Sequence, residues 1–139
     1  MAYSGYLIKI GGSNGTDLPM KYIKAESYKI TPDQRMESKA ARDTTGVLHR
    51  TTVAHKATKI EFETPPITNA DVSALNTLFS NAYSDALQRR LTIQFYDEET
   101  DSYREADCYM PDVQYNINRI DQANYVIYYN PIRFAFIEY

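Results

Sequence analysis

Few residues of this chain have a type and spacing that could do chemistry. His49 and His55 are the only histidines, and Cys108 is the only cysteine. On one extended strand the two imidazoles would lie about 20 Å apart, at roughly 3.3 Å per residue, which is too far to share a metal ion. No acidic residue stands near either at a spacing typical of a zinc site. We interpret both as exposed or interface histidines, although a hairpin or a subunit contact would change their separation.

Two further stretches have the composition of ligand sites. The acidic run DEETDSYREAD, Asp97 to Asp107, is rich in oxygen ligands, but it lacks the glycine and the spaced terminal glutamate of a calcium loop. The run GGSNG, Gly11 to Gly15, lacks the lysine and the following helix of a phosphate-binding loop. No GxSxG motif is present, and Cys108 lies in a predicted strand with no histidine nearby. The sequence therefore predicts no catalytic residue, no metal site and no cofactor.

Charge is distributed unevenly along the chain. Residues 33–59 contain six basic and three acidic residues, a net charge of +3, whereas residues 97–107 contain one basic and six acidic residues, a net charge of −5. The two segments have the character of two halves of one contact. The total charge of −3 argues against a general nucleic-acid binder, which would be strongly basic. Contact of the basic segment with phosphates stays an alternative.

Bulk properties predict one soluble domain over residues 1–139. The chain is 43% hydrophobic and 24% charged, and its length suits a single core. A lone cysteine excludes an intrachain disulfide. The N-terminal residues have neither the basic region nor the apolar run of a signal peptide, and no stretch is long enough to span a membrane. We expect an intracellular product, at least when it is made.

Alternation of apolar and polar residues predicts most of the strands. Thr58 to Glu63 alternates as a strand with one buried face should, and so does Leu91 to Tyr96. Tyr103 to Tyr109 is the expected hairpin partner of the latter strand. Further strands are predicted at Tyr6–Ile10, Met20–Thr31 with a bulge near Ala25 and an end at Pro32, Val47–Val53, Val113–Ile117, Tyr125–Tyr129 and Ile132–Tyr139.

A single helix is predicted over residues 68–86. Thr68 with Asp71 has the form of a capping box, and apolar residues then recur at spacings of three and four. Seven to nine strands with one helix predict an α+β, mainly β, domain. We expect a small β-sandwich or half-open barrel with the helix packed against it and a long loop early in the chain.

The long loop is the segment from Gln34 to Thr58. Its first part, Gln34 to Thr45, has Met36 as its only large apolar side chain. Such a segment cannot bury itself, so we expect an extended loop or hairpin that takes its order from another subunit.

Several motifs in the second part of the chain resemble a family of small tail proteins of phages and prophages of Gram-positive bacteria. The stretches are TTGVLHR, TKIEFETPPIT before the helix, YMPDVQY, and YNPIRFAFIEY. The similarity runs from about Gly46 to Tyr139. It is clearest at Leu48, His49, Arg50, Lys59, Glu61, Tyr109, Met110, Pro111, Asp112, Tyr129, Pro131, Ile132 and Arg133.

The resemblance implies a structural part of the virion and not an enzyme. The order of elements is similar to the tail-tube fold, which tube proteins, tube terminators and the ring domain of distal tail proteins share. It implies a ring, expected to be a hexamer, that surrounds a DNA conduit without binding DNA specifically. The expected partners are copies of itself and other tail proteins, namely the tube, the tape measure and the tip or baseplate. The expected location is the virion tail, after assembly in the host cytoplasm.

On this interpretation the charged segments supply contacts between subunits. The candidate residues are Arg35, Lys39, Arg42, Thr45, His49, Arg50, Asp97, Glu98, Glu99 and Asp101. Two alternatives stay open. One is a tail-completion or head-to-tail connector protein, and the other is a small β-rich module that binds a carbohydrate or the host surface. Clustering of the tyrosines Tyr103, Tyr109, Tyr115 and Tyr125 on one open surface would favour the binding module.

Overall fold

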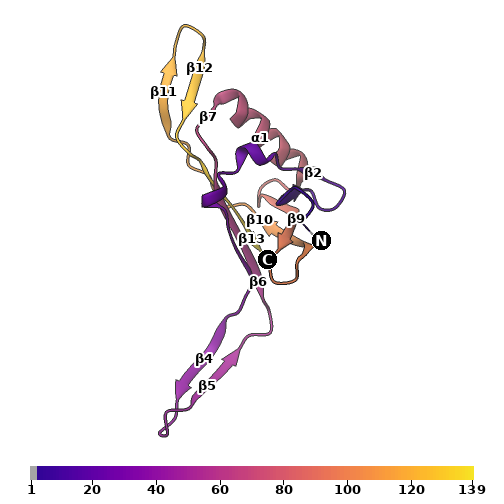
Figure 1. Ribbon diagram of the computed structural model, residues 1–139, viewed down its shortest axis with the longest axis vertical. Helices are drawn as coiled ribbons and strands as arrows, with labels where there is room; N and C mark the ends of the chain where they lie inside the picture. The colour runs from indigo at the N-terminus through magenta and orange to yellow at the C-terminus, as the bar shows by residue number, and fades with distance from the viewer. Residues whose placement is uncertain (1–2) are drawn as a thin grey trace.

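The computed structural model describes residues 3–139 as a central body with one hairpin projecting from each end (Figure 1). The body contains an eight-stranded antiparallel sheet in the order β2-β1-β9-β10-β13-β6-β3, with β8 also paired to β9. Its strands are β1 (Ile8–Ile10), β2 (Thr16–Asp17), β3 (Lys29–Gln34), β6 (Ala57–Glu63), β8 (Tyr83–Asp85), β9 (Arg90–Asp97), β10 (Ser102–Tyr109) and β13 (Arg133–Glu138).

The remaining elements form the projections and the cover of the sheet. A three-stranded sheet has the order β11-β12-β7, and a two-stranded sheet joins β4 and β5. These elements are β4 (Glu37–Arg42), β5 (Leu48–Thr52), β7 (Ile67–Thr68), β11 (Ile117–Asp121), β12 (Val126–Tyr129), α1 (Asn69–Ala82) and the short 3-10 helices η1 (Met20–Tyr22) and η2 (Ala25–Ser27). The predicted class, α+β and mainly β with one α-helix, is confirmed.

The core lies between α1 and the inner face of the large sheet. Alternation places one set of apolar side chains on this face, each at most 1% exposed: Ile8, Ile60, Phe62, Leu91, Ile93, Phe95, Phe134 and Phe136. Phe79 of α1 packs on them, with its ring centroid 5.3 Å from that of Phe134. The strands predicted from alternation at Thr58–Glu63 and Leu91–Tyr96 therefore supply the centre of the core.

The helix begins where the sequence predicts but ends four residues earlier than the predicted 68–86. At its start Asp71 accepts a hydrogen bond from the backbone N–H of Thr68, as in a capping box. At its end the chain turns extended, because β8 pairs with β9. The apolar period of the sequence continues past the end of the helix and does not indicate the strand. The strand depends on pairing with a segment that is not its neighbour in the helix.

The prediction of an extended strand over Met20–Thr31 that ends at Pro32 is wrong. Half of that stretch forms η1 and η2, and β3 then runs from Lys29 through Pro32 to Gln34. Proline is tolerated here because β3 is an edge strand and its pairing with β6 shifts register between Thr31 and Gln34. The described residues form thirteen strands, more than the seven to nine expected, because several two- and three-residue pieces join the sheets.

The root of the first projecting hairpin is joined to β10 by side chains. Asp33 of the edge strand β3 lies 3.2 Å from Arg104 of β10, measured between carboxylate Oδ2 and guanidinium Nη2. Two strands, β13 and β6, stand between β10 and β3 in the sheet. The two side chains therefore reach across these strands and connect the hairpin root to β10.

Candidate functional site: a basic arm

The feature that sets this molecule apart from a compact domain is the hairpin of β4 and β5, here called the arm, residues 34–56. Every residue of the arm is exposed. It projects from the body at the end opposite the hairpin of β11 and β12 (Figure 1). The boundary expected at Thr58 moves back two residues, because Ala57 and Thr58 belong to β6 of the body.

The arm has regular internal order, which corrects the expectation that residues 34–45 are ordered only by another subunit. β4 and β5 form an antiparallel ladder in which Arg42 pairs with Leu48 and Ala40 pairs with Arg50. Backbone hydrogen bonds of the ladder replace the missing apolar contacts. A two-stranded hairpin without a covering layer is marginal in water, however, so it gains stability when a partner covers it.

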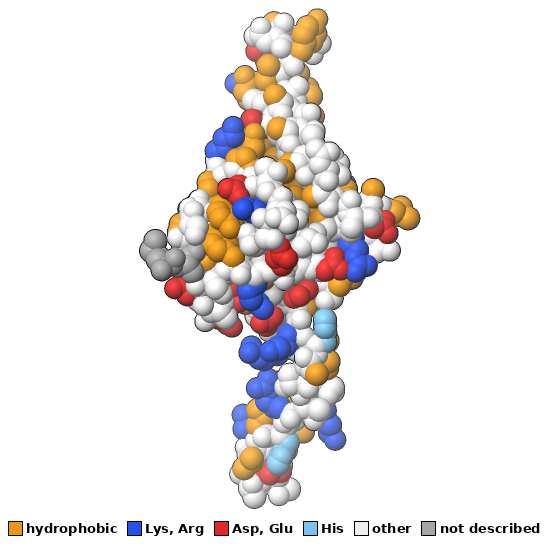
Figure 2. Space-filling view, turned by 90° about the vertical axis from the view of Figure 1, so that its right-hand side faces the viewer, with side chains coloured by type: hydrophobic (Ala, Val, Ile, Leu, Met, Phe, Trp, Pro, Cys, Tyr) orange, Lys and Arg blue, Asp and Glu red, His pale blue; other side chains and the backbone are white. Residues whose placement is uncertain are grey.

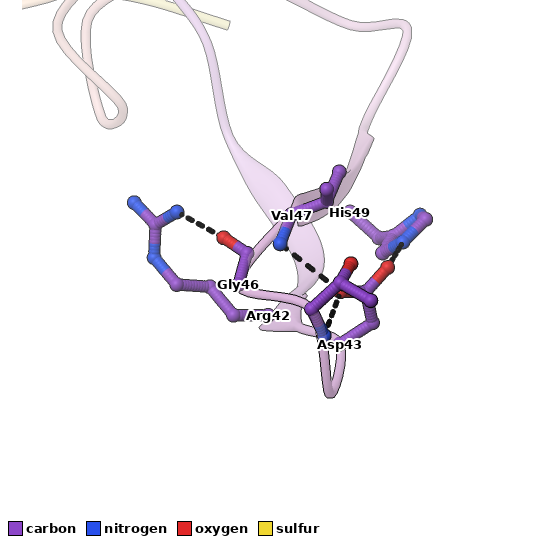
Figure 3. A network of polar contacts seen from close by, with 6 residues as sticks. Arg42, Asp43, Gly46, Val47 and His49 are labelled. Carbon is purple, nitrogen blue, oxygen red and sulfur yellow. Dashed lines mark hydrogen bonds and ion pairs between the residues drawn. The ribbon is translucent and has the colours of Figure 1, made fainter.

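The turn at the tip of the arm is built around the carboxylate of Asp43 (Figure 3). Its Oδ1 accepts hydrogen bonds from the backbone N–H of Thr45 at 2.9 Å and of Val47 at 3.0 Å. The hydroxyl of Thr45 also donates to Oδ1, at 2.7 Å. Gly46 adopts a φ of +87°, which suits glycine in the left-handed region and lets the chain reverse. The tip is therefore preformed in the single chain.

Asp43 also contacts a histidine. His49 Nε2 lies 2.9 Å from Asp43 Oδ2. Hydrogen bonds from Thr45, His49 and Val47 hold the pKa of Asp43 well below its usual range. The carboxylate is thus charged at neutral pH, and the predicted contact residues Thr45 and His49 are engaged inside the tip.

Basic charge on the arm is only partly neutralised within it. Its two acids are both paired, Asp43 with His49 and Glu37 with Arg50. Arg42 donates to the backbone carbonyl of Gly46 at 2.9 Å. Three cations make no hydrogen bond or ion pair with any described residue, and these are Arg35, Lys39 and Lys56. The arm carries five basic and two acidic residues, a net +3, so the rest of a chain of net charge −3 carries −6.

The six predicted contact residues of the arm do not gather on one face. Cross-strand pairing places Arg42 and Arg50 on one face and Lys39 and His49 on the other. Figure 2 shows Lys and Arg side chains spread along this projection. The arm therefore presents positive charge in two directions, as a ribbon inserted between two surfaces would.

The acidic turn between β9 and β10 agrees with the prediction in part. Glu98, Glu99 and Asp101 are exposed there. Asp97 is 1% exposed and lies 2.7 Å from Nε of Arg104, so its expected role as an exposed contact is wrong. Asp101 accepts a hydrogen bond from the hydroxyl of Tyr96, which raises the pKa of that tyrosine to about 12. Three carboxylates thus remain available to a cationic partner.

Groups that could do covalent or metal chemistry are scattered. Among residues 3–139 no three His, Cys, Asp or Glu side chains come together as a metal site. Burial raises the pKa of the Cys108 thiol to about 12, which disfavours the reactive thiolate. In the same part of the chain, no helix has the length and apolar character needed to traverse a bilayer.

The tyrosines do not form one open platform. Tyr103 stacks on Tyr6 at 4.4 Å between ring centroids. The other three lie elsewhere: Tyr109 packs against Tyr139, Tyr115 packs against Tyr129, and Tyr125 is 81% exposed at the turn after β11. This division gives no support to a carbohydrate-binding surface.

A second exposed surface was not predicted. In the hairpin of β11 and β12, Ile120 pairs with Ile127 and Ile117 pairs with Tyr129, so these side chains share one face. Ile117 and Ile120 are 51% and 57% exposed. The strand predicted over Val113–Ile117 is wrong in its bounds, because β11 begins only at Ile117 and runs to Asp121. Ile117 and Ile120 stand three residues apart, so no alternation indicates this face in the sequence.

The comparisons with known proteins give one match. Neither the curated proteins nor the solved structures yield a match. A model of a family of unknown function, DUF6711, matches residues 1–139. Since this match covers the whole chain, the protein belongs to the DUF6711 family.

Proposed function

We propose that this protein is a structural, non-enzymatic component of a phage tail that forms a ring, expected to be hexameric, around the DNA conduit. The observation that carries the proposal is the arm: a preformed basic ribbon, exposed on both faces, that leaves its own body. A marginal hairpin with three unpaired cations is stabilised most simply by another protein surface. The tail-tube resemblance of the sequence supplies the virion context.

Exposed area supports the view that the chain is made to be covered by partners. Its accessible surface is 8566 Å². A compact monomer of this mass would expose about 7,400 Å², roughly 1,200 Å² less. A specific interface typically buries about 800 Å² per partner. The excess is therefore large enough for at least one such interface.

Charge supports self-association as the use of the arm. The arm carries +3 and the rest of the chain carries −6, so the arm of one copy is attracted to the body of another. Glu98, Glu99 and Asp101 form the acidic turn proposed to receive it. Such rim charges set orientation and association rate more than affinity. We therefore assign the affinity between copies to backbone contacts of the β4–β5 ladder and to apolar contacts.

A negative body also suits the proposed passage of DNA. Carboxylates along a lumen repel phosphates, whereas a protein that grips DNA has a strongly basic face. DNA would pass without specific contacts. The proposed neighbours are further copies of the chain, the tube, the tape measure and the tip or baseplate, with assembly in the host cytoplasm.

The test replaces the outer arm. In the variant, residues 39–50 are exchanged for a short Gly-Ser linker. We expect a cooperative thermal transition like that of the wild type, because the core lies elsewhere, and loss of ring formation or of incorporation into tails, measured by light scattering and electron microscopy.

A matched control variant carries the same Gly-Ser exchange at the other hairpin turn, residues 122–125. Assembly at the wild-type level by the variant that lacks residues 39–50 would contradict the proposed use of the arm. A tail-completion or head-to-tail connector protein would also form a ring. Neighbouring genes separate these positions: a tape-measure gene indicates the tube or tip, and a portal gene indicates the connector.

A further inference from the structure

Two residues at the root of the arm, one on each side of it, are bonded to each other. Asp33 precedes the first strand of the arm, and Thr58 follows the second. The backbone N–H of Asp33 donates to the hydroxyl of Thr58 at 3.1 Å. Thr58 is 2% exposed and Asp33 is partly exposed, so this bond is partly buried at the point where the arm leaves the body.

Asp33 is held to the body by a partly buried cation. Its carboxylate lies 3.2 Å from Nη2 of Arg104. Nε of the same guanidinium lies 2.7 Å from Asp97, which is 1% exposed. Arg104 therefore bridges one carboxylate of the body and one of the arm root. Asp97 is buried, and the side chains of Arg104 and Asp33 are only 33% and 28% exposed, so salt screens this bridge less than a fully exposed pair.

The other side of the root is fixed to a different strand. The backbone N–H of Thr58 donates to Oε1 of Glu138 at 2.8 Å. Glu138 lies on β13, and Arg104 lies on β10. Each strand that enters the arm is thus tied to the body by its own polar contact, and the Asp33–Thr58 bond couples the two.

The backbone at the root is unusual as well. Asp33 has a φ of +48°, a left-handed conformation that is uncommon for a residue other than glycine. It lies where the pairing of β3 with β6 shifts register between Thr31 and Gln34. A bulge of this kind bends a strand and changes the direction of its later residues. The contacts of Asp33 hold this bend in place.

We propose that Asp33, Thr58, Asp97, Arg104 and Glu138 form a root clamp that fixes the direction of the arm relative to the body. Arg104 is its central positioning residue, because it joins the arm root to the core side of the sheet. The clamp is a property of the single chain. Its use, to aim the arm at the next subunit, rests on the proposed function.

The experiment measures the direction of the arm in the unassembled chain. Spin labels are placed at Thr44→Cys in the tip and Ser73→Cys on α1, and their distance distribution is recorded by pulsed electron resonance, with labelled chain diluted in unlabelled chain. The clamp variant is Asp33→Gly with Thr58→Val. It removes the Asp33–Arg104 ion pair and the Asp33–Thr58 hydrogen bond but leaves the Arg104–Asp97 pair and the bond from the Thr58 backbone to Glu138 in place, and glycine accepts the φ of position 33.

We expect a narrow distribution in the wild type and a distribution at least twofold wider in the clamp variant. The control Glu61→Gln breaks the ion pair of Glu61 with Arg133, a pair that joins β6 to β13 without touching the arm root, and should leave the width unchanged. A wild-type distribution as wide as that of the clamp variant, or a clamp variant as narrow as the wild type, would overturn the clamp.

A second variant and a second readout keep the outcomes separate. If the double variant shows no cooperative thermal unfolding, the single variant Asp33→Gly replaces it. This variant should also widen the distance distribution relative to the wild type. Assembly is then measured on the same proteins. A widened distance distribution together with wild-type assembly would support the clamp and count against the proposed role of the arm. An unchanged distance distribution would overturn the clamp, whether or not the variant assembles.

Discussion

At the residue scale, the tip of the arm shows how much order one side chain can supply. Asp43 accepts from two backbone N–H groups and one hydroxyl and contacts an imidazole. The signal was present in the sequence as Asp followed three residues later by Gly46, a combination favoured in turns. The lack of apolar residues predicted that the segment has no order of its own. That prediction fails because local hydrogen bonds can replace burial in a hairpin.

The lowered pKa of Asp43 predicts how the tip responds to acid. A carboxylate with a lowered pKa in the folded state stabilises that state above its ordinary pKa, about 3.9, and the stabilisation is lost as pH falls through the lowered value. In two-dimensional NMR the amide signals of Thr45 and Val47 should therefore titrate with a midpoint clearly below 3.9. Asp43→Asn should abolish this titration. A midpoint at or above 3.9 would mean that the bonds drawn in Figure 3 do not hold in solution.

At the element scale, the sequence predicts what alternation and local chemistry control. The strands through Ile60 and Ile93 and the capping box at Thr68 are where the pattern places them. The end of α1 and the course of β3 through Pro32 are not, because both depend on pairing with strands distant in sequence. The candidate site divides in the same way: the sequence predicts its basic residues, whereas the burial of Asp97 depends on the tertiary fold, in which Arg104 pairs with it.

The core predicts a sharp contrast between buried and exposed aromatic residues. Phe134 is 1% exposed and packs against Phe62 and Phe79. Phe134→Ala should lower the free energy of unfolding by about 3–5 kcal/mol, the usual cost of a phenylalanine cavity. The control Tyr125→Ala, at a side chain 81% exposed, should change it by less than about 0.5 kcal/mol. Urea denaturation followed by circular dichroism measures both, and equal losses would place the core elsewhere.

At the scale of the whole molecule, the two hairpins leave opposite ends of a body whose charge is opposite to that of the arm (Figures 1 and 2). Segment charges are readable from the sequence, but the projection of the basic segment away from the body is not, because it depends on pairing between strands that are distant in sequence. A basic pole on an acidic body favours head-to-tail contact between copies. Such contacts close into a ring when the rotation between neighbours closes.

The size and shape of the purified protein test whether it forms a ring. Multi-angle light scattering combined with negative-stain electron microscopy, over a range of protein concentrations and at low ionic strength, measures both. We predict a closed ring with an open lumen, a mass that is an integral multiple of the protomer, and slower assembly on addition of salt. A protein that stays a solitary monomer at every concentration, with or without salt, would contradict this prediction.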